Sequence, residues 1–551
     1  MNRSLSLGLS IAAALCLLLW GFYYSSFDLW GDEIISLKDY ALAGFTTTVT
    51  TYLDPNNHIL LNLLNNAVSD LLGIRNLYQA MDQVPLFRWL QWGVSLGTCL
   101  YVLLMGKKFF SPSAGVLSLV FLVTCLPFLN FSMQLRGYGL SMFFAAALAY
   151  HAWSAEERRS WRNLALVSVT AFGILYVIPS NAYFAFALGV LLTWRALWPV
   201  DESEKGRSFW LRRGTWVVAA LSSGALLALL AYSPVLRDLF NNRFVEASPD
   251  DRMFILARRL PQVALNLVSF RYLVIPIALG GFFFALRKRD HRLPGSERAA
   301  PLIGLLLFPF LFSFFRNDEA FQRTFIFLAP LFSLALGAGV AWCLQNSVGR
   351  VRVRDLLTGV VAVYAFGTLA FAHITVQGRL QENLRSGIRE QTILANYYQL
   401  GGFHPSRVAM ELAMVHEDRP GPVLLVDGLD PVSLTYYLMK EDLNSTSILS
   451  LRPAGQGESG THIGLFQKSQ GRGEELTFFR SEIHLEDELQ GGDQLTPSLV
   501  VAKAYEPSDL YYVVTAFYEK NRDLFRTLYP SLGMETVFEL EGFACLRIPT
   551  N

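Results

Sequence analysis

Long apolar segments recur along the first two thirds of the chain, and they predict helices that cross a membrane. A hydrocarbon core about 30 Å thick requires roughly 20 apolar residues in a helix. We expect the shorter runs to be tilted or kinked, or partly shielded by neighbouring helices. We expect about eleven transmembrane helices, a polytopic α-helical membrane domain over residues 1–373. The runs lie near 5–24, 86–106, 113–131, 138–153, 163–178, 182–199, 215–233, 264–286, 301–315, 321–344 and 356–373.

The pattern changes after residue 373, where short strands and amphipathic helices replace the long apolar runs. This pattern predicts a separate soluble α/β domain over residues 374–551. We expect a polar connector helix, a buried strand, a helix, a second strand, an amphipathic helix and a terminal hairpin. In chain order these lie at 379–400, 422–427, 431–440, 447–451, 509–528 and 536–548.

One early loop, 25–85, is long and polar and contains helical patterning of its own. The segment from His58 to Val68 has the apolar spacing of an amphipathic helix, and Asp54-Pro55 before it is a turn signal. Loops much longer than a dozen residues are usually functional or disordered. We therefore expect a functional loop whose helix lies along the membrane surface.

Composition agrees with a membrane protein that carries a soluble part. The 551 residues are 52% hydrophobic and 17% charged, whereas soluble domains average about 25% charged. Residues 374–551 hold 15 Lys and Arg against 24 Asp and Glu, although the whole chain has a net charge of +1. Because no basic run is interleaved with aromatic residues, a nucleic-acid partner is not expected. Four of the five cysteines lie in apolar runs, so no disulfide framework is expected.

The basic loops predict the orientation of the chain. With the N-terminus inside, basic clusters near residues 107, 158, 205, 290 and 350 face the cytoplasm. The loop 25–85 and the acidic segment 374–551 are then external. The first span has no signal-peptidase pattern, so we expect it to be retained. We expect a multi-pass protein of a bacterial inner membrane whose C-terminal domain is periplasmic or extracellular.

Several polar residues fall at the predicted external face. Asp32 and Glu33 follow the first span, where a carboxylate pair suits proton abstraction or cation binding; the alternative is two solvated loop acids. His58 opens the loop helix, where a lone histidine is more often a cap or a packing residue. A second acid pair, Asp318-Glu319, occupies a later external loop. No His or Cys pattern for zinc is present, whereas a cation bound by carboxylates alone stays open.

Three arginines share one position in this topology, at or near the external end of a span. Such arginines often extend to the interface only to keep their charge in water. Three guanidinium groups that converge there would instead suit a phosphate, which arginine binds through two parallel hydrogen bonds. The three are Arg136, Arg271 and Arg323.

Three segments together resemble the GT-C superfamily of glycosyltransferases, which use polyprenyl-phosphate sugars. They are Asp32-Glu33, then Asp54-Pro-Asn-Asn-His58-Ile-Leu-Leu, then Leu135-Arg-Gly-Tyr-Gly-Leu140. Their order and their side of the membrane are similar to the branch of protein O-mannosyltransferases and lipid A aminoarabinose transferases. Phe321 to Pro330 is weakly similar to a late segment of the same family. Ile59 departs from the family, which has a proline after this histidine.

The resemblance implies an inverting transfer of a sugar from a lipid phosphate to an acceptor hydroxyl on the external face. In that reading Asp32 is the general base with Glu33 in support. Arg136, Arg271 and Arg323 bind the donor phosphate, and His58 and Asp54 are loop contacts. The partners would be a polyprenyl-phosphate-linked sugar, membrane lipids and an acceptor that is a glycolipid, a polymer or a protein. No cofactor is expected.

Two other classes of function compete with the enzyme. A transporter or flippase of a lipid-linked anionic glycan would use the same arginines. Such a protein also needs charged sites near mid-membrane and commonly shows an inverted repeat. Few charged residues lie in mid-span here, and no inverted repeat is visible in the sequence. A membrane-anchored binding module would not require so many spans.

Overall fold

The computed structural model describes most of the chain up to residue 346 and the helices and strands of the C-terminal part. The described residues are 3–25, 27–52, 57–198, 208, 212–241, 260–267, 271–287, 296–316, 322–346, 359–360, 363, 366–367, 405–418, 423–426, 431–441, 448–453, 461–466, 482–484, 510–516, 535–540 and 543–549. The predicted domain boundary at 373/374, the connector helix at 379–400, Asp54 and the acid pair Asp318-Glu319 lie outside them.

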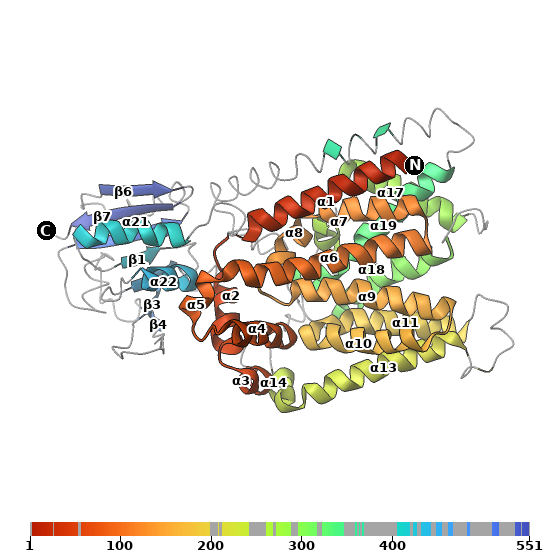
Figure 1. Ribbon diagram of the computed structural model, residues 1–551, viewed down its shortest axis with the longest axis horizontal. Helices are drawn as coiled ribbons and strands as arrows, with labels where there is room; N and C mark the ends of the chain where they lie inside the picture. Colours follow the sequence, from red (N-terminus) through yellow and green to blue (C-terminus); the bar gives the residue numbers. More distant parts are fainter. Residues whose placement is uncertain are drawn as a thin grey trace.

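The helices described between residues 3 and 346 form a bundle and pack side by side (Figure 1). Short elements join the long ones: α2 (Gly31–Ile35), a π-helical turn (Ser36–Ala41), α3 (Phe45–Thr50), α5 (Leu77–Asp82), α14 (Leu236–Asn241) and α16 (Leu260–Leu267). The longer helices are α1 (Arg3–Ser25), α4 (Ile59–Leu72), α6 (Val84–Phe109), α7 (Pro112–Val123), α8 (Leu126–Met133), α9 (Tyr138–Glu157), α10 (Trp161–Val177), α11 (Ala182–Leu197), α13 (Arg213–Ala231), α17 (Arg271–Arg287), α18 (Ala299–Arg316) and α19 (Ala329–Asn346).

The apolar helices support an integral membrane protein. Among the described residues, four helices are long and apolar enough to cross a membrane: Ser4–Tyr23, Val84–Phe109, Arg213–Ala231 and Arg323–Gln345. Further apolar helices of 10–17 residues lie at Ile59–Leu72, Trp161–Val177, Ile275–Leu286 and Ala299–Phe315. The number of eleven spans stays a prediction.

The span predicted at 113–131 is not one straight helix. It is divided into α7 and α8, and the two parts are bent by 70°. Pro127 lies in the first turn of α8, where its missing N–H and its ring prevent α7 from continuing. The bend directs the chain after α8 into the segment that carries Arg136.

The loop helix is confirmed, and it is longer than predicted. It begins after His58 and runs as α4 to Leu72, where Gly73 ends it with a left-handed φ of 70°. α4 packs on the π-helical turn that follows α2. The structure thereby joins the two halves of the loop 25–85 at one end of the bundle.

The C-terminal part holds two helices, α21 (Pro405–Asp418) and α22 (Pro431–Lys440), and one seven-stranded mixed sheet in the order β4-β3-β2-β1-β5-β7-β6. β1 pairs in parallel with β2 and β5, and the other pairs are antiparallel. The strands are β1 (Val423–Val426), β2 (Ile448–Pro453), β3 (Thr461–Phe466), β4 (Glu482–His484), β5 (Leu510–Ala516), β6 (Glu535–Leu540) and β7 (Phe543–Pro549).

Most element predictions in this part agree with the structure, and one is wrong. The strands near 422–427 and 447–451, the helix 431–440 and the terminal hairpin are present as β1, β2, α22 and β6–β7. The amphipathic helix predicted at 509–528 begins instead as the strand β5, between β1 and β7. A short run rich in aromatic and β-branched residues, such as Leu510 to Ala516, cannot be separated from a helix by periodicity alone.

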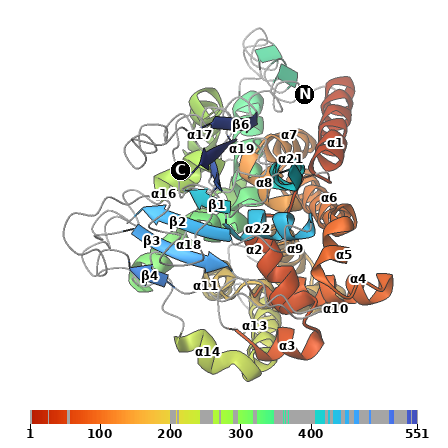
Figure 2. The ribbon, with the colours of Figure 1, turned by 90° about the vertical axis from the view of Figure 1, so that its left-hand side faces the viewer.

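The two ends of the bundle differ in what lies on them. α2, α5 and the C-terminal part lie at one end, on the left of Figure 1, and we call this the α2 end. Figure 2 looks onto this end, with α22 beside α2. α6 and α9 finish at the opposite end, which we call the Glu157 end.

Candidate active site

The acid pair lies in the first turn of α2. Asp32 and Glu33 follow Trp30, and the Trp30 backbone N–H donates to Glu33 Oε2 over 2.8 Å, which caps the start of α2. Acidic side chains are favoured there because unpaired N–H groups give a helix N-terminus partial positive charge. The local sequence therefore fixes which way each carboxylate leaves the backbone.

Glu33 lies in a fully buried network. Its carboxylate pairs with Arg88, with Nη1 to Oε1 at 3.1 Å, and neither side chain is exposed. Glu33 Oε1 also accepts from the backbone N–H of Leu135 at 2.6 Å, and Arg88 donates to the carbonyls of Met133 and Asp28, each at 2.9 Å. The pair thus ties together α2, α6 and the segment that precedes Arg136.

Asp32 is the partner of Arg136. Arg136 Nη1 lies 2.6 Å from Asp32 Oδ2; the arginine side chain is 2% exposed and the aspartate side chain 25%. The Arg136 guanidinium also lies over the ring of Tyr138, 5.0 Å from its centroid. The two neighbouring acids therefore differ: one is enclosed, and the other reaches solvent beside a buried cation.

His58 lies next to this ion pair. Its ring is buried and contacts Tyr138 edge to face at 5.4 Å. Burial, and then the positive charges of Arg136 and Arg323, hold the pKa of His58 well below its ordinary value. Its Nε2 is buried and finds no hydrogen-bond partner among the described residues. The histidine is therefore a neutral group beside two arginines.

Gly137 makes room for His58. A Cβ at this position would lie 2.6 Å from Val177 Cγ1 and 3.0 Å from His58 Nδ1. The φ of Gly137 is −62°, which any residue can adopt. Space, and not backbone conformation, thus selects glycine in the motif that follows Arg136.

The structure brings together some of the residues selected from sequence. Asp32, Arg136 and His58 are in one place, and Arg323, in the 3₁₀ helix Gln322–Leu328, is close enough to lower the pKa of His58. Arg271 begins α17, and its side chain is outside what the structure describes.

Sequence reasoning missed the contacts that position the acid pair. Arg88 could have been noticed as a charged residue inside the span predicted at 86–106. Tyr437 gave no such signal: its hydroxyl accepts from the backbone N–H of Leu29 at 2.9 Å, from 408 residues away. Burial, with Asp28 nearby, raises the pKa of Tyr437 well above its ordinary value, so the hydroxyl stays protonated. The Ser406 N–H donates to Asp28 Oδ2 at 2.8 Å.

Within the described ranges, no three His, Cys, Asp or Glu side chains gather in a way that could hold a metal ion. The carboxylates of Asp32 and Glu33 each contact an arginine instead.

No protein-family model and no curated protein sequence matches this chain. Solved structures match, among them glycosyltransferases of the GT-C type. ArnT from Cupriavidus metallidurans in the apo state has a TM-score of 0.49 at 12% identity, covering 98% of both chains. The same enzyme bound to undecaprenyl phosphate has a TM-score of 0.46 at 12% identity, covering 98% of this chain and 97% of that one.

A second similar structure is the oligosaccharyltransferase AglB from Archaeoglobus fulgidus, in complex with an inhibitory peptide and a dolichol-phosphate. Its TM-score is 0.36 at 13% identity, covering 81% of this chain and 69% of that one. Another structure of the A. fulgidus oligosaccharyltransferase is a complex with Zn and sulfate.

Proposed function

We propose that this chain is a membrane glycosyltransferase that moves a sugar from a polyprenyl-phosphate donor to an acceptor hydroxyl, with inversion. The observation that carries the proposal is the Asp32–Arg136 pair at the α2 end. It joins a partly exposed carboxylate to a buried guanidinium within 2.6 Å. Such a pair offers a proton acceptor and an anion ligand in one place, which is what attack on a sugar phosphate requires.

In the reaction, the acceptor oxygen attacks the anomeric carbon on the face opposite the phosphate. The bond from that carbon to the phosphate oxygen breaks, and its electron pair leaves with the polyprenyl phosphate. The hydroxyl proton passes to Asp32. Arg136 and Arg323 stabilise the charge that develops on the departing phosphate, since guanidinium groups bind phosphate through two hydrogen bonds. We assign the same role to Arg271.

Binding of the donor would also prepare the base. Arg136 donates to Asp32 in the free protein, so an arriving phosphate competes with the carboxylate for this cation. When the guanidinium turns to the phosphate, Asp32 gains a lone pair for the acceptor proton. Glu33 cannot accept the proton in the same way, because Arg88, Leu135 and Trp30 already donate hydrogen bonds to its oxygens. We therefore assign Glu33 the supporting role of a positioning residue.

His58 completes this arrangement as a neutral group. Its buried Nε2 without a partner can hydrogen-bond to the donor without adding a third positive charge beside the two arginines. Asp54 stays a proposed loop contact. A divalent cation at the carboxylates is not needed for the step, because arginines neutralise the leaving phosphate.

The site is proposed to face the periplasm or the cell exterior of a bacterial inner membrane, with residues 374–551 as a soluble α/β domain on the same side. Contacts between the C-terminal helices and the loop support a common side: Tyr437 meets the Leu29 backbone, and Lys440 Nζ lies 2.6 Å from Asp82 Oδ1. The acceptor is a glycolipid, a polymer or a protein.

The purified protein tests this proposal with a radiolabelled polyprenyl-phosphate sugar. We expect donor cleavage and a glycoside of inverted anomeric configuration when an acceptor is supplied. Movement of intact donor across vesicles without cleavage would identify a transporter and reject the enzyme. In intact cells, an impermeant reagent should label a cysteine placed at position 470 and not one at position 205; the opposite result would reject the outward-facing site.

A further inference from the structure

A second cluster of charged side chains lies at the Glu157 end, far along the helices from the acid pair. Glu156 and Glu157 end α9, and cations from other helices converge on them. Arg195 Nε lies 3.2 Å from Glu156 Oε1, Arg298 Nη2 lies 2.8 Å from Glu157 Oε1, and Lys108 Nζ lies 3.5 Å from Glu157 Oε2. The cluster therefore joins α6, α9, α11 and the 3₁₀ turn Ser296–Arg298 that precedes α18.

Positive charge exceeds negative charge in this cluster. Arg213 is a fourth cation, and it donates to the backbone carbonyl of Glu156 at 3.3 Å. Glu297 is a third carboxylate, 3.9 Å from Arg298 Nε. Four cations therefore face three carboxylates and the C-terminus of α9, which carries partial negative charge.

The arginines of the cluster also have donors left over. The Arg298 side chain is 5% exposed and lies over the ring of Phe109, 4.6 Å from its centroid. Its Nε and Nη1 have no hydrogen-bond partner among the described residues, and neither has Arg195 Nη1. Buried donors of a charged group are costly to leave unpaired. Their number and position indicate a ligand with several acceptor oxygens.

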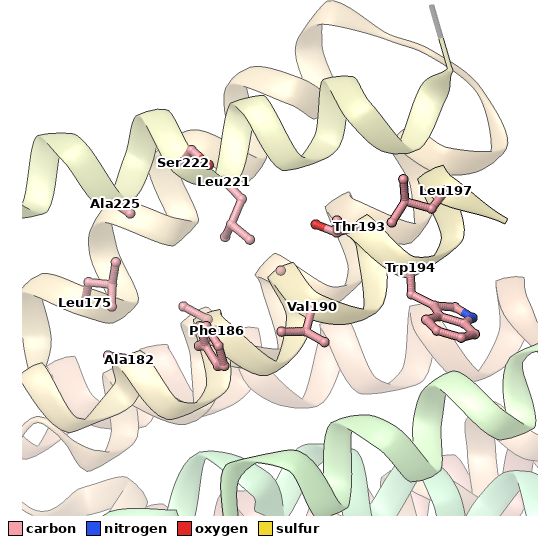
Figure 3. Close-up of a pocket in the computed structure, with 12 residues that line it drawn as sticks. Leu175, Ala182, Phe186, Val190, Thr193, Trp194, Leu197, Leu221, Ser222 and Ala225 are labelled. Atoms are coloured by element: carbon pink, nitrogen blue, oxygen red, sulfur yellow. The ribbon is translucent and has the colours of Figure 1, made fainter. Parts of the chain in front are cut away.

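An apolar groove runs beside this cluster on the outside of the bundle. It lies between α11 and α13 and has a volume of about 630 Å³. Figure 3 shows Trp194 and Leu197 at one end of the groove and Ala182 and Ala225 toward the other. Arg195 lies next to Trp194 in the chain, and Arg212 donates to the Leu197 carbonyl at 3.0 Å. Basic side chains therefore border the groove at its Glu157 end.

We propose that the cluster and the groove together bind one anionic glycerophospholipid. Its phosphate is held by Arg195 and Arg298, and one acyl chain lies in the groove between α11 and α13. Arginine pairs readily with phosphate oxygens, and an acyl chain gains free energy by covering apolar side chains. Anionic lipids also concentrate near basic residues on the cytoplasmic side of a membrane. The polyprenyl donor is proposed at the other end of the bundle, so this site is separate from it.

Native mass spectrometry of the full-length protein in detergent tests the proposal. Phosphatidylglycerol and phosphatidylcholine with the same acyl chains are titrated in parallel, together with inorganic phosphate. We expect retention of phosphatidylglycerol in preference to phosphatidylcholine and a rise of the thermal midpoint with phosphatidylglycerol alone. Equal retention of the two lipids would overturn the proposal. An equal rise with inorganic phosphate would also overturn it, because the site would then take a free anion.

Two variants separate the headgroup contact from the groove. Arg195→Gln should weaken phosphatidylglycerol binding about tenfold or more, since a charge-assisted bond is lost. Thr193→Trp fills the groove without a change of charge and should weaken binding of both lipids. The control is Arg75→Gln at the α2 end, where the Arg75 side chain is 71% exposed and pairs with Asp70. Normal phosphatidylglycerol binding by Arg195→Gln, or the same loss in the control, would contradict the proposal.

Discussion

Acidic and basic side chains are paired differently at the two ends of the bundle. At the α2 end each acid of the pair contacts its own arginine: Glu33 with Arg88, and Asp32 with Arg136. At the Glu157 end two glutamates are shared among several cations. An ion pair that is fully buried can only stabilise the fold. An ion pair that reaches solvent, as at Asp32, can exchange its partner for a ligand. The buried donors of Arg195 and Arg298 that have no partner among the described residues can also take a ligand from outside.

The largest effect is expected when the enclosed pair is broken. Arg88→Met leaves Glu33 charged and buried, a change that typically costs about 3–5 kcal/mol. We expect little folded protein, or a much lower thermal midpoint in detergent. Arg195→Met is the matched change at the Glu157 end, where the arginine side chain is 25% exposed. An equal fall of the thermal midpoint in the two variants would contradict the distinction between the two ends.

Loss of a proposed phosphate ligand should weaken donor binding while the fold survives. Arg136→Ala and Arg323→Ala should each cost about 1.5–3 kcal/mol of donor affinity, the value of a hydrogen bond to a charged group. Lysine should restore only part of the affinity, because it lacks the planar fork. Titration with a fluorescent polyprenyl-phosphate donor measures the affinity of each variant. Arg75→Ala serves as the exposed control, and unchanged affinity in both site variants would make these arginines interfacial anchors.

Filling the space beside His58 should have a moderate effect. Gly137→Ala places a Cβ against His58 and Val177, and such overpacking typically costs about 1–3 kcal/mol. We expect a lower thermal midpoint and slower transfer. Gly93→Ala, where nothing lies within 4 Å of the added carbon, should be neutral or slightly stabilising. If Gly137→Ala transferred sugar at the normal rate, His58 would not need its present position.

The smallest effect concerns pH. An ordinary histidine gains a proton as the pH falls through 6.5, but the pKa of His58 is held well below that value by burial and two arginines. His58 should therefore stay neutral as the pH is lowered from about 7.5 through 6.5. The ratio of donor affinities of the wild type and His58→Gln should be constant over that range. An inflection near pH 6.5 in the wild type that vanishes in the variant would mean that His58 titrates normally.

Local sequence patterns predicted the elements of the loop more reliably than their partners. The helix after His58 was predictable because its apolar positions repeat with helical spacing, and the two acids were visible as a pair after the first span. The bend between α7 and α8 was not predicted, although Pro127 marks it. An apolar run gives the length of a segment and says little about its direction.

The contacts that define the site were largely beyond sequence reasoning. Glu33 and Asp32 are neighbours of the same type, and only tertiary contacts make one enclosed and the other accessible. Arg88 joins Glu33 across 55 residues, and Tyr437 joins Leu29 across 408. Such pairings depend on how the helices pack. The strand β5 was predicted as a helix for a related reason, since its neighbours in the sheet decide its conformation.

The central claim is that Asp32 accepts the acceptor proton, and Asp32→Asn tests it most directly. The asparagine keeps the shape and much of the hydrogen bonding but cannot take the proton. Since a positioned base contributes roughly 10²–10⁴-fold, we predict that formation of the glycoside by the purified variant falls by about that factor while donor binding is preserved. Asp70→Asn, an exposed acid of the same loop, should transfer normally. Glycoside formation by Asp32→Asn at close to the wild-type rate would contradict the assignment.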